Sequence, residues 1–200
     1  MGNKSITGVV LAGGSSSRMG QNKALLKLDS DTMIERVVDS LQSLFGETIV
    51  VTNNEEEYSM LNNVRFVRDF KNLEVKSSLV GLYSGLISAN SDYIFVVACD
   101  MPLLNIPLIE FMKDKIKNQD ILIPNIKGYY EPLHAFYSKS CLNSMKNQLD
   151  QKDYKILNFF SKLNVEIIDE ASIRQFDPHL NSFLNINNYE EYMEFKNKYI

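Results

Sequence analysis

Short apolar runs alternate along this chain with longer stretches in which apolar residues recur at helical spacing. The short runs are residues 7–11, 48–52, 64–67, 93–99, 120–124, 133–137 and 165–168. Several are continuously apolar and rich in β-branched residues, which is typical of strands covered on both faces. The stretches predicted to be helical are 32–45, 79–89, 107–117, 139–148, 154–163 and 189–199.

This alternation predicts an α/β fold with a mostly parallel, Rossmann-like sheet between two layers of helices. Apolar residues make up 44% of the 200 residues, enough for a sizeable core, and this length suits one domain. Ligands of such sheets bind beyond the carboxyl ends of the strands. The residues that follow each predicted strand are therefore the first candidates for a binding site.

The first predicted helix has recognisable end signals. Thr32 and Glu35 have the spacing of a capping box, in which each side chain bonds the other's backbone N–H. Gly46 follows the last apolar position, where a C-terminal glycine is expected.

A loop rich in glycine and serine follows the first strand and contains two cations, Arg18 and Lys23. Such a loop can direct backbone N–H groups at a polyphosphate while the cations neutralise its charge. It is not a P-loop, because five residues separate Gly14 from Gly20 and Gln21 follows. The dinucleotide fingerprint G-x-G-x-x-G is also absent. A plain strand–turn–helix connection would need the glycines without both cations.

A second signal lies at the end of the fourth predicted strand, where the apolar run 93–99 is followed by Asp100 and Pro102. A single carboxylate at a strand end suits Mg²⁺, which usually takes one or two carboxylates together with phosphate oxygens and water. The alternative is that Asp100 only caps the turn before the next helix.

The string Leu-Ala-Gly-Gly-x-Ser-x-Arg-Met-Gly-x-x-Lys at 11–23 resembles the signature of nucleotidyltransferases of the nucleotide-diphospho-sugar transferase type. Within them it is most similar to the molybdenum cofactor guanylyltransferases. The resemblance implies that the loop binds the GTP triphosphate, that Arg18 and Lys23 balance charge in catalysis, and that Asp100 binds Mg²⁺. The loop residues implied in GTP binding are Leu11, Ala12, Gly13, Gly14, Ser15 and Lys23.

Three further side chains are implied by the same resemblance. Asp69 follows the third strand, where a carboxylate can accept hydrogen bonds from guanine N1–H and N2–H. Asn53, or its neighbour Asn54, follows the second strand at a nucleoside-contacting position. Asn185 belongs to a closing segment, 183–191, in which it and Asn187 point the same way; Asn188 is better explained as a helix N-cap.

For two other segments, the residues allow either a structural or a functional role. Gly81 and Gly85 either let a helix pack closely or contact the nucleotide. Glu131 and His134 either orient an acceptor or, for His134 above all, belong to the core.

Composition excludes several classes. The net charge of −4 argues against nucleic acid as a partner. The two cysteines, Cys99 and Cys141, cannot form a four-thiolate zinc site, and Cys99 is expected to be a buried thiol. No apolar stretch is long enough to cross a membrane, so we expect a cytoplasmic protein.

The resulting expectation is an enzyme that transfers GMP from GTP to molybdenum-bound molybdopterin, with Mg²⁺ as cofactor and other molybdenum cofactor proteins as partners. Residues 6–104 would bind the nucleotide and 105–200 the acceptor. Alternatives are another base or acceptor, such as cytidylyl transfer to molybdopterin or transfer to a sugar phosphate, and a non-catalytic nucleotide-binding subunit.

Overall fold

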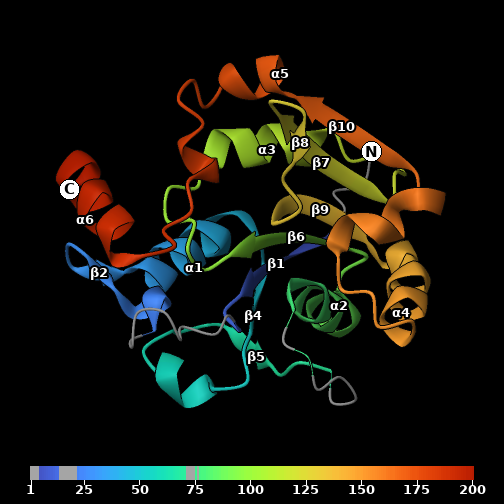
Figure 1. Cartoon of the computed structure of the whole chain (residues 1–200), viewed down its shortest axis with the longest axis horizontal. Coiled ribbons are helices and arrows are strands. Elements are labelled where there is room, and N and C mark those ends of the chain that lie inside the picture. The colour runs from blue at the N-terminus through green and yellow to red at the C-terminus, as the bar shows by residue number, and fades with distance from the viewer. Residues whose placement is uncertain (1–4, 14–21, 71–74, 76) are drawn as a thin grey trace.

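The computed structural model describes residues 5–13, 22–70, 75 and 77–200. Its central sheet has the strand order β10-β7-β9-β6-β1-β4-β5, with β8 paired to β7 (Figure 1). The strands are β1 (Ile6–Leu11), β4 (Glu47–Val51), β5 (Arg65–Val67), β6 (Tyr93–Ala98), β7 (Ile121–Ile126), β8 (Tyr129–Tyr130), β9 (His134–Ser138) and β10 (Val165–Asp169). Each strand predicted from the sequence is present, with ends displaced by two residues or fewer.

The sheet is mostly parallel, as predicted. β1 pairs parallel with β4 and β6, β4 with β5, and β10 with β7. β9 is the exception, since it lies antiparallel between β6 and β7. In this register Val97, near the end of β6, lies opposite His134 at the start of β9. The segment that precedes β9 therefore reaches the same edge of the sheet as the carboxyl end of β6.

Helices cover both faces of the sheet, which confirms the three-layer architecture (Figure 1). The α-helices are α1 (Met33–Leu44), α2 (Ser78–Ser88), α3 (Ile106–Asp114), α4 (Leu142–Asp150), α5 (Glu170–Arg174) and α6 (Tyr189–Tyr199). Val10 packs in the core on the side of α1 and α3, while its neighbour Val9 packs on the side of α2 and α4. This alternation buries β1 on both faces, as its apolar sequence predicts.

The start of α1 is as predicted and its end is not. The Thr32 side chain accepts from the Glu35 N–H at 3.3 Å, and the Glu35 carboxylate accepts from the Thr32 N–H at 2.7 Å. The helix ends at Leu44 with Phe45 as the C-cap, and Gly46 does not have a positive φ. The expected C-terminal role of Gly46 is therefore wrong, because the chain leaves α1 in an extended conformation that any residue adopts.

Several elements differ from the sequence pattern. The predicted helix 154–163 is a 3₁₀ helix, η4 (Ile156–Lys162), and the start of the predicted helix 139–148 is the 3₁₀ turn η3 (Lys139–Cys141). A small hairpin of β2 (Lys27–Leu28) and β3 (Asp31–Thr32) was not predicted. Three other 3₁₀ turns are η1 (Lys23–Leu25), η2 (Glu55–Tyr58) and η5 (Asn181–Phe183). Among the described residues, no helix is long and apolar enough to cross a membrane.

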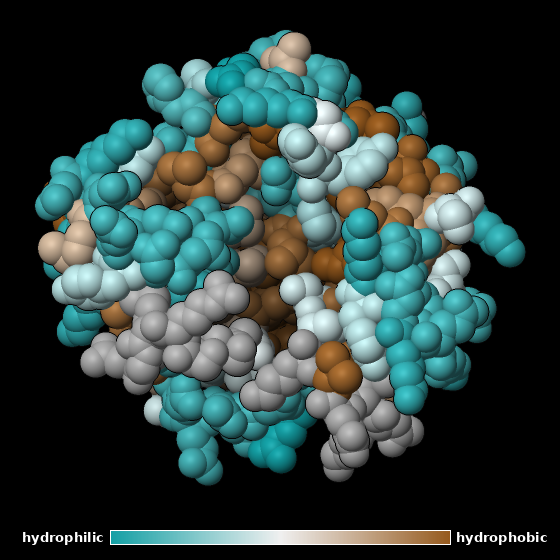
Figure 2. All heavy atoms as spheres, viewed as in Figure 1, coloured by the Kyte–Doolittle hydropathy of each residue, from teal (hydrophilic) through white to brown (hydrophobic). Residues whose placement is uncertain are grey.

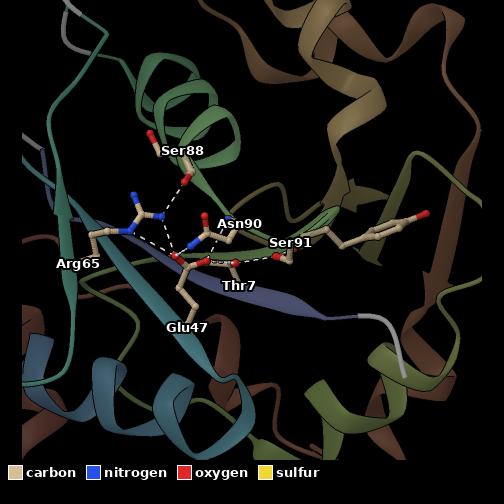
Figure 3. Close-up of polar contacts among 7 residues, drawn as sticks. Thr7, Glu47, Arg65, Ser88, Asn90 and Ser91 are labelled. Atoms are coloured by element: carbon tan, nitrogen blue, oxygen red, sulfur yellow. Dashed lines mark hydrogen bonds and ion pairs between the residues drawn. The ribbon is translucent and has the colours of Figure 1, made fainter. Parts of the chain in front are cut away.

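Glu47, at the start of β4, connects several segments by hydrogen bonds at the amino-terminal ends of the parallel strands (Figure 3). Its carboxylate accepts from the Thr7 hydroxyl at 2.6 Å, from Arg65 Nη2 at 2.7 Å and from Asn90 Nδ2 at 2.8 Å. Burial alone would raise the pKa of Glu47, but these hydrogen bonds outweigh it and lower the pKa. Glu47 thus joins β1, β5 and the α2–β6 connection.

Candidate active site

A cavity of about 610 Å³ lies at the carboxyl edge of the sheet. Figure 2 shows a hollow near the middle of this face, with hydrophobic atoms on its floor and hydrophilic residues around it. The predicted site residues that line the cavity are Leu11, Ala12, Gly13, Lys23, Asp69, Asp100 and Asn185. Three others, Gly14, Ser15 and Arg18, lie outside the described residues.

Lys23 and Asp100 meet in this cavity although 77 positions separate them in sequence. Lys23 Nζ lies 3.4 Å from Asp100 Oδ2, and their side chains are 24% and 19% exposed. The backbone N–H of Cys99 donates to the Leu11 carbonyl at 3.2 Å, which keeps the ends of β1 and β6 together. Since the ion pair is long and partly solvated, it contributes little to stability and leaves both groups able to interact with a ligand.

The closing segment completes this pair. The Ile186 N–H donates to the Asp100 carbonyl at 3.1 Å, and the Ile186 carbonyl accepts from Lys23 Nζ at 3.3 Å. Ile186 is buried, while Asn185 and Asn187 on either side of it line the cavity. The prediction that these two amides point the same way is therefore confirmed, and Asn188 is the N-cap of α6 through the Glu191 N–H at 2.9 Å.

Asp100 is not a helix cap. The N-cap of α3 is Asn105, whose side chain accepts from the Leu108 N–H at 2.9 Å. Asp100 lies five residues earlier and faces the cavity, so the capping alternative is wrong. Cys99 was also expected to be buried, but it is partly exposed and lines the cavity, because β6 ends one residue before it. Burial nevertheless raises the pKa of the Cys99 thiol to about 12, so it is protonated at neutral pH.

One buried tyrosine contacts both ends of the glycine-rich loop. The Tyr58 hydroxyl donates to the Ala12 carbonyl at 3.2 Å and accepts from Asn22 Nδ2 at 2.8 Å. The Asn22 side chain also accepts from the Ala24 N–H at 3.1 Å and so caps the 3₁₀ turn that begins at Lys23. Burial raises the pKa of Tyr58 to about 12, which keeps its hydroxyl proton available for donation. Sequence analysis missed Tyr58 and Asn22, because neither lies in a recognisable motif.

Asp69 and Asn53 form a pair at the far end of the cavity. Asn53 Nδ2 donates to Asp69 Oδ2 at 2.9 Å, and the Asp69 N–H donates to Asn53 Oδ1 at 3.1 Å. Asp69 lines the cavity, whereas Asn53 stands behind it. Asn54 instead bonds Glu57 at 2.9 Å, which favours Asn53 among the two candidates.

The structure decides between the two interpretations for Gly85 and leaves both open for Gly81. A Cβ at Gly85 would lie 2.6 Å from Val9 Cγ1, so Gly85 serves the close packing of α2 on β1. Gly81 lines the cavity and also lies against Leu11.

His134 belongs to the core. It is fully buried between the rings of Phe95 and Phe183, with centroid distances of 5.1 and 4.6 Å. Burial lowers its pKa to about 3, so the imidazole is neutral at ordinary pH. Glu131 does line the cavity, together with Pro132 and Leu133. The sequence signal for Glu131 is its position just before the strand predicted at 133–137.

The fold and the cavity define an α/β protein in which charged side chains meet at the carboxyl edge of a mostly parallel sheet, where ligands of such sheets bind. Residues 8–166 match the family described as the MobA-like NTP transferase domain, and the chain belongs to this family of nucleotidyltransferases.

Named relatives agree with this membership. The chain is 39% identical to the molybdenum cofactor guanylyltransferase of Desulfosudis oleivorans, covering 93% of this chain and 92% of that one. It is 38% identical to a protein of Natranaerobius thermophilus named probable molybdenum cofactor guanylyltransferase, covering 98% and 96%. The crystal structure of molybdopterin-guanine dinucleotide biosynthesis protein A from Archaeoglobus fulgidus superposes with a TM-score of 0.82 at 28% identity, covering 96% and 97%. These matches confirm the resemblance to molybdenum cofactor guanylyltransferases and support a nucleotidyltransferase role in molybdenum cofactor biosynthesis.

Proposed function

We propose that this protein transfers GMP from GTP to molybdenum-bound molybdopterin and releases pyrophosphate. The observation that carries the proposal is the meeting of Lys23 and Asp100 in a cavity beside Gly13, at the mouth of β1. The names of the relatives supply the nucleotide and the acceptor.

In this reaction the acceptor phosphate attacks the α-phosphorus of GTP in line, and pyrophosphate leaves. The nucleophile is already an anion, so catalysis consists of positioning and charge stabilisation. Lys23 and Arg18 neutralise charge on the departing pyrophosphate. The backbone N–H groups of Gly13, Gly14 and Ser15 hold the phosphates.

Asp100 is suited to hold Mg²⁺ against the phosphate oxygens. Its carboxylate is a hard oxygen donor that is partly exposed to the cavity. Among the described residues, no three His, Cys, Asp or Glu side chains gather into a metal site. A single protein carboxylate leaves most coordination positions to phosphate and water, as Mg²⁺ prefers. When bound, the ion would withdraw charge from the phosphate oxygens.

The two halves of the chain would divide the substrates. Asp69, held by Asn53, would contact the nucleoside within residues 6–104. Asn185 and Asn187 would contact the acceptor within residues 105–200. The Lys23–Asp100 pair lines the same cavity and bonds the backbone of Ile186, between these two asparagines.

A nucleotide panel tests the base. Thermal unfolding is measured with GTP, CTP, ATP or UTP and Mg²⁺, and we expect GTP alone to stabilise strongly, by about 2.7 kcal/mol at 100 times its dissociation constant. Stabilisation by CTP instead would indicate cytidylyl transfer. Pyrophosphate release is then measured with molybdopterin or a sugar phosphate as acceptor. GTP binding without pyrophosphate release in the presence of molybdopterin would contradict the proposed reaction.

A further inference from the structure

Glu131 is a cavity-lining carboxylate with no part in the reaction described so far. It precedes β9 and is fixed through its backbone. The Glu131 N–H donates to the Pro124 carbonyl at 3.0 Å, and the Glu131 carbonyl accepts from the His134 N–H at 3.1 Å. The position of Glu131 is therefore set by β7 and β9, independently of its side chain.

The Glu131 carboxylate has no protein partner among the residues that the structure describes. Burial, the sole cause of its shift, raises the pKa of Glu131. The contrast is Glu47, whose hydrogen bonds lower its pKa. A desolvated carboxylate without a partner destabilises the fold, and carboxylates in this condition beside a cavity are candidates for ligand contact.

Sheet topology puts Glu131 on the side of β6 that faces β9 and β7. β9 separates β6 from β7, and Glu131 bonds to β7. β8 and β9 pair with the same edge of β7, and Glu131 lies between them in sequence, so Glu131 stands about one strand spacing, roughly 4.8 Å, from the line of β6, which delivers Asp100. Asp69 follows β5 on the opposite side of β6. Asp69 and Glu131 thus flank the Lys23–Asp100 pair from its two sides.

The chemistry of a carboxylate restricts what it binds here. An ionised carboxylate accepts hydrogen bonds and donates none, and it repels the acceptor phosphate. A pterin ring carries a 2-amino-4-oxopyrimidine edge like that of guanine, with a ring N–H beside an exocyclic amino group. Two parallel hydrogen bonds to one carboxylate match this edge.

We propose that Glu131 is a specificity residue for the acceptor, and that its carboxylate accepts hydrogen bonds from the ring N–H and amino group of the pterin. This rests on the proposed function only for the choice of a pterin acceptor. The interaction would place the pterin away from Asp100 and leave the acceptor phosphate near the Lys23–Asp100 pair.

The test is a fluorescence titration of the full chain with 6-hydroxymethylpterin, which needs no turnover. Glu131→Gln keeps the shape and removes the charge, and Glu131→Asp keeps the charge and shortens the reach. Glu110→Gln, at an exposed position on α3, is the matched control. We expect Glu131→Gln to weaken pterin binding by about tenfold or more, as for a hydrogen bond to a charged group, and Glu110→Gln to leave it unchanged. A pterin methylated at the ring N–H should bind wild type and Glu131→Gln equally weakly.

Other measurements separate this role from its rivals. Glu131→Gln should unfold no more easily than wild type, because a neutral amide replaces a half-buried charge that has no partner among the described residues. A clear loss of stability would indicate a structural role and overturn the proposal. Equal pterin binding by wild type and Glu131→Gln would also overturn the proposal. If a higher Mg²⁺ concentration restored the activity of Glu131→Gln, Glu131 would instead be a metal ligand, which would overturn it too.

Failure of the proposed function has a different signature. Wild type would then release no pyrophosphate with GTP and molybdopterin, and the pterin titration would still decide the role of Glu131. If wild type does turn over, Glu131→Gln should have a higher KM for molybdopterin and the same KM for GTP as wild type.

Discussion

Lys23 and Asp100 show how single residues acquire a role from the strands that precede them. Lys23 begins a 3₁₀ turn after the β1 loop, and Asp100 follows the last residue of β6 by two positions. β1 and β6 are hydrogen-bonded neighbours, so their carboxyl ends deliver both side chains to one place. The Lys23–Asp100 ion pair is 3.4 Å long and partly solvated, so little interaction free energy is lost when a ligand separates the two side chains.

Lys23→Ala and Asp100→Asn should each reduce kcat by about 10²–10³, by analogy with the loss of one donor that stabilises transition-state charge. Circular dichroism and urea unfolding should remain close to wild type, because the pair is weak. Single-turnover formation of product, followed by quenched flow, measures the effect. Product formation by either variant at the wild-type rate would exclude that residue from the reaction.

Glu47→Gln should lower the free energy of unfolding by about 1–3 kcal/mol at neutral pH, as for hydrogen bonds to a charged group. The pKa of Glu47 is lowered in the folded state, so the carboxylate stabilises the protein above its unfolded pKa of about 4.5. This contribution is lost as the pH falls through the folded pKa. Urea unfolding at a series of pH values should show the wild-type advantage disappearing in acid; an advantage that persists below that range would contradict the assignment.

At the scale of elements, the packing of α2 on β1 determines the shape of the cavity wall. α2 begins beside the cavity with Ser77 and Ser78, and Gly81 lies one turn further along. Gly85, one turn beyond Gly81, meets the strand so closely that no side chain fits between them. The glycines therefore set the distance from helix to sheet beside the cavity.

Gly85→Ala should destabilise the protein by about 1–3 kcal/mol, because its Cβ would lie 2.6 Å from the stiff, buried Val9 side chain. Gly46→Ala is the matched control, since nothing lies within 4 Å of a Cβ there and φ is not positive. The control should be neutral or stabilise by up to about 1 kcal/mol. Chemical denaturation of both variants measures the difference, and equal stabilities would show that α2 can move away from the sheet at no cost.

For the whole molecule, the end of the chain completes a site begun by its first residues. α6 lies beside the β2–β3 hairpin, and Tyr192 and Phe195 pack with Leu28 and Met33 in a small separate core (Figure 1). The Tyr192 hydroxyl also donates to the Lys27 carbonyl at 2.6 Å. Ile186 belongs to the same core, and its backbone bonds both Asp100 and Lys23. The packing of α6 therefore helps to hold Ile186, and through its backbone Asp100 and Lys23, in place.

Phe195→Ala should lower the free energy of unfolding by about 3 kcal/mol, because a buried ring is lost from a core that has few members. Turnover should also fall, although Phe195 lies outside the cavity, since the Ile186 backbone would be less firmly held. Glu194→Gln, at the exposed neighbouring position, should change neither quantity. A variant that loses stability and keeps wild-type kcat would separate the C-terminal core from the site.

Prediction from sequence succeeded for features that residues close together in the chain determine. Thr32 and Glu35 form their capping box from neighbouring atoms alone, and continuous apolar runs become strands because nothing else buries them on both sides. It failed where distant contacts decide. The stretch 154–163 has helical spacing, but it packs as a 3₁₀ helix with Phe159 and Phe160 against Tyr137 of β9. The roles of Tyr58 and Asn22 depend on residues more than thirty positions away.

The sequence by itself determined the alternation of strands and helices, the burial of the sheet on both faces, and the side chains at the ends of β1 and β6. These follow from periodicity and from residue chemistry, which are local properties. The tertiary structure alone decided that β9 enters antiparallel and that Ile186 bridges Asp100 and Lys23. It also decided that Glu131 lines the cavity with no partner for its carboxylate in the described part of the chain. The physical reason is that desolvation and pairing of a polar group depend on which distant segments fold against it.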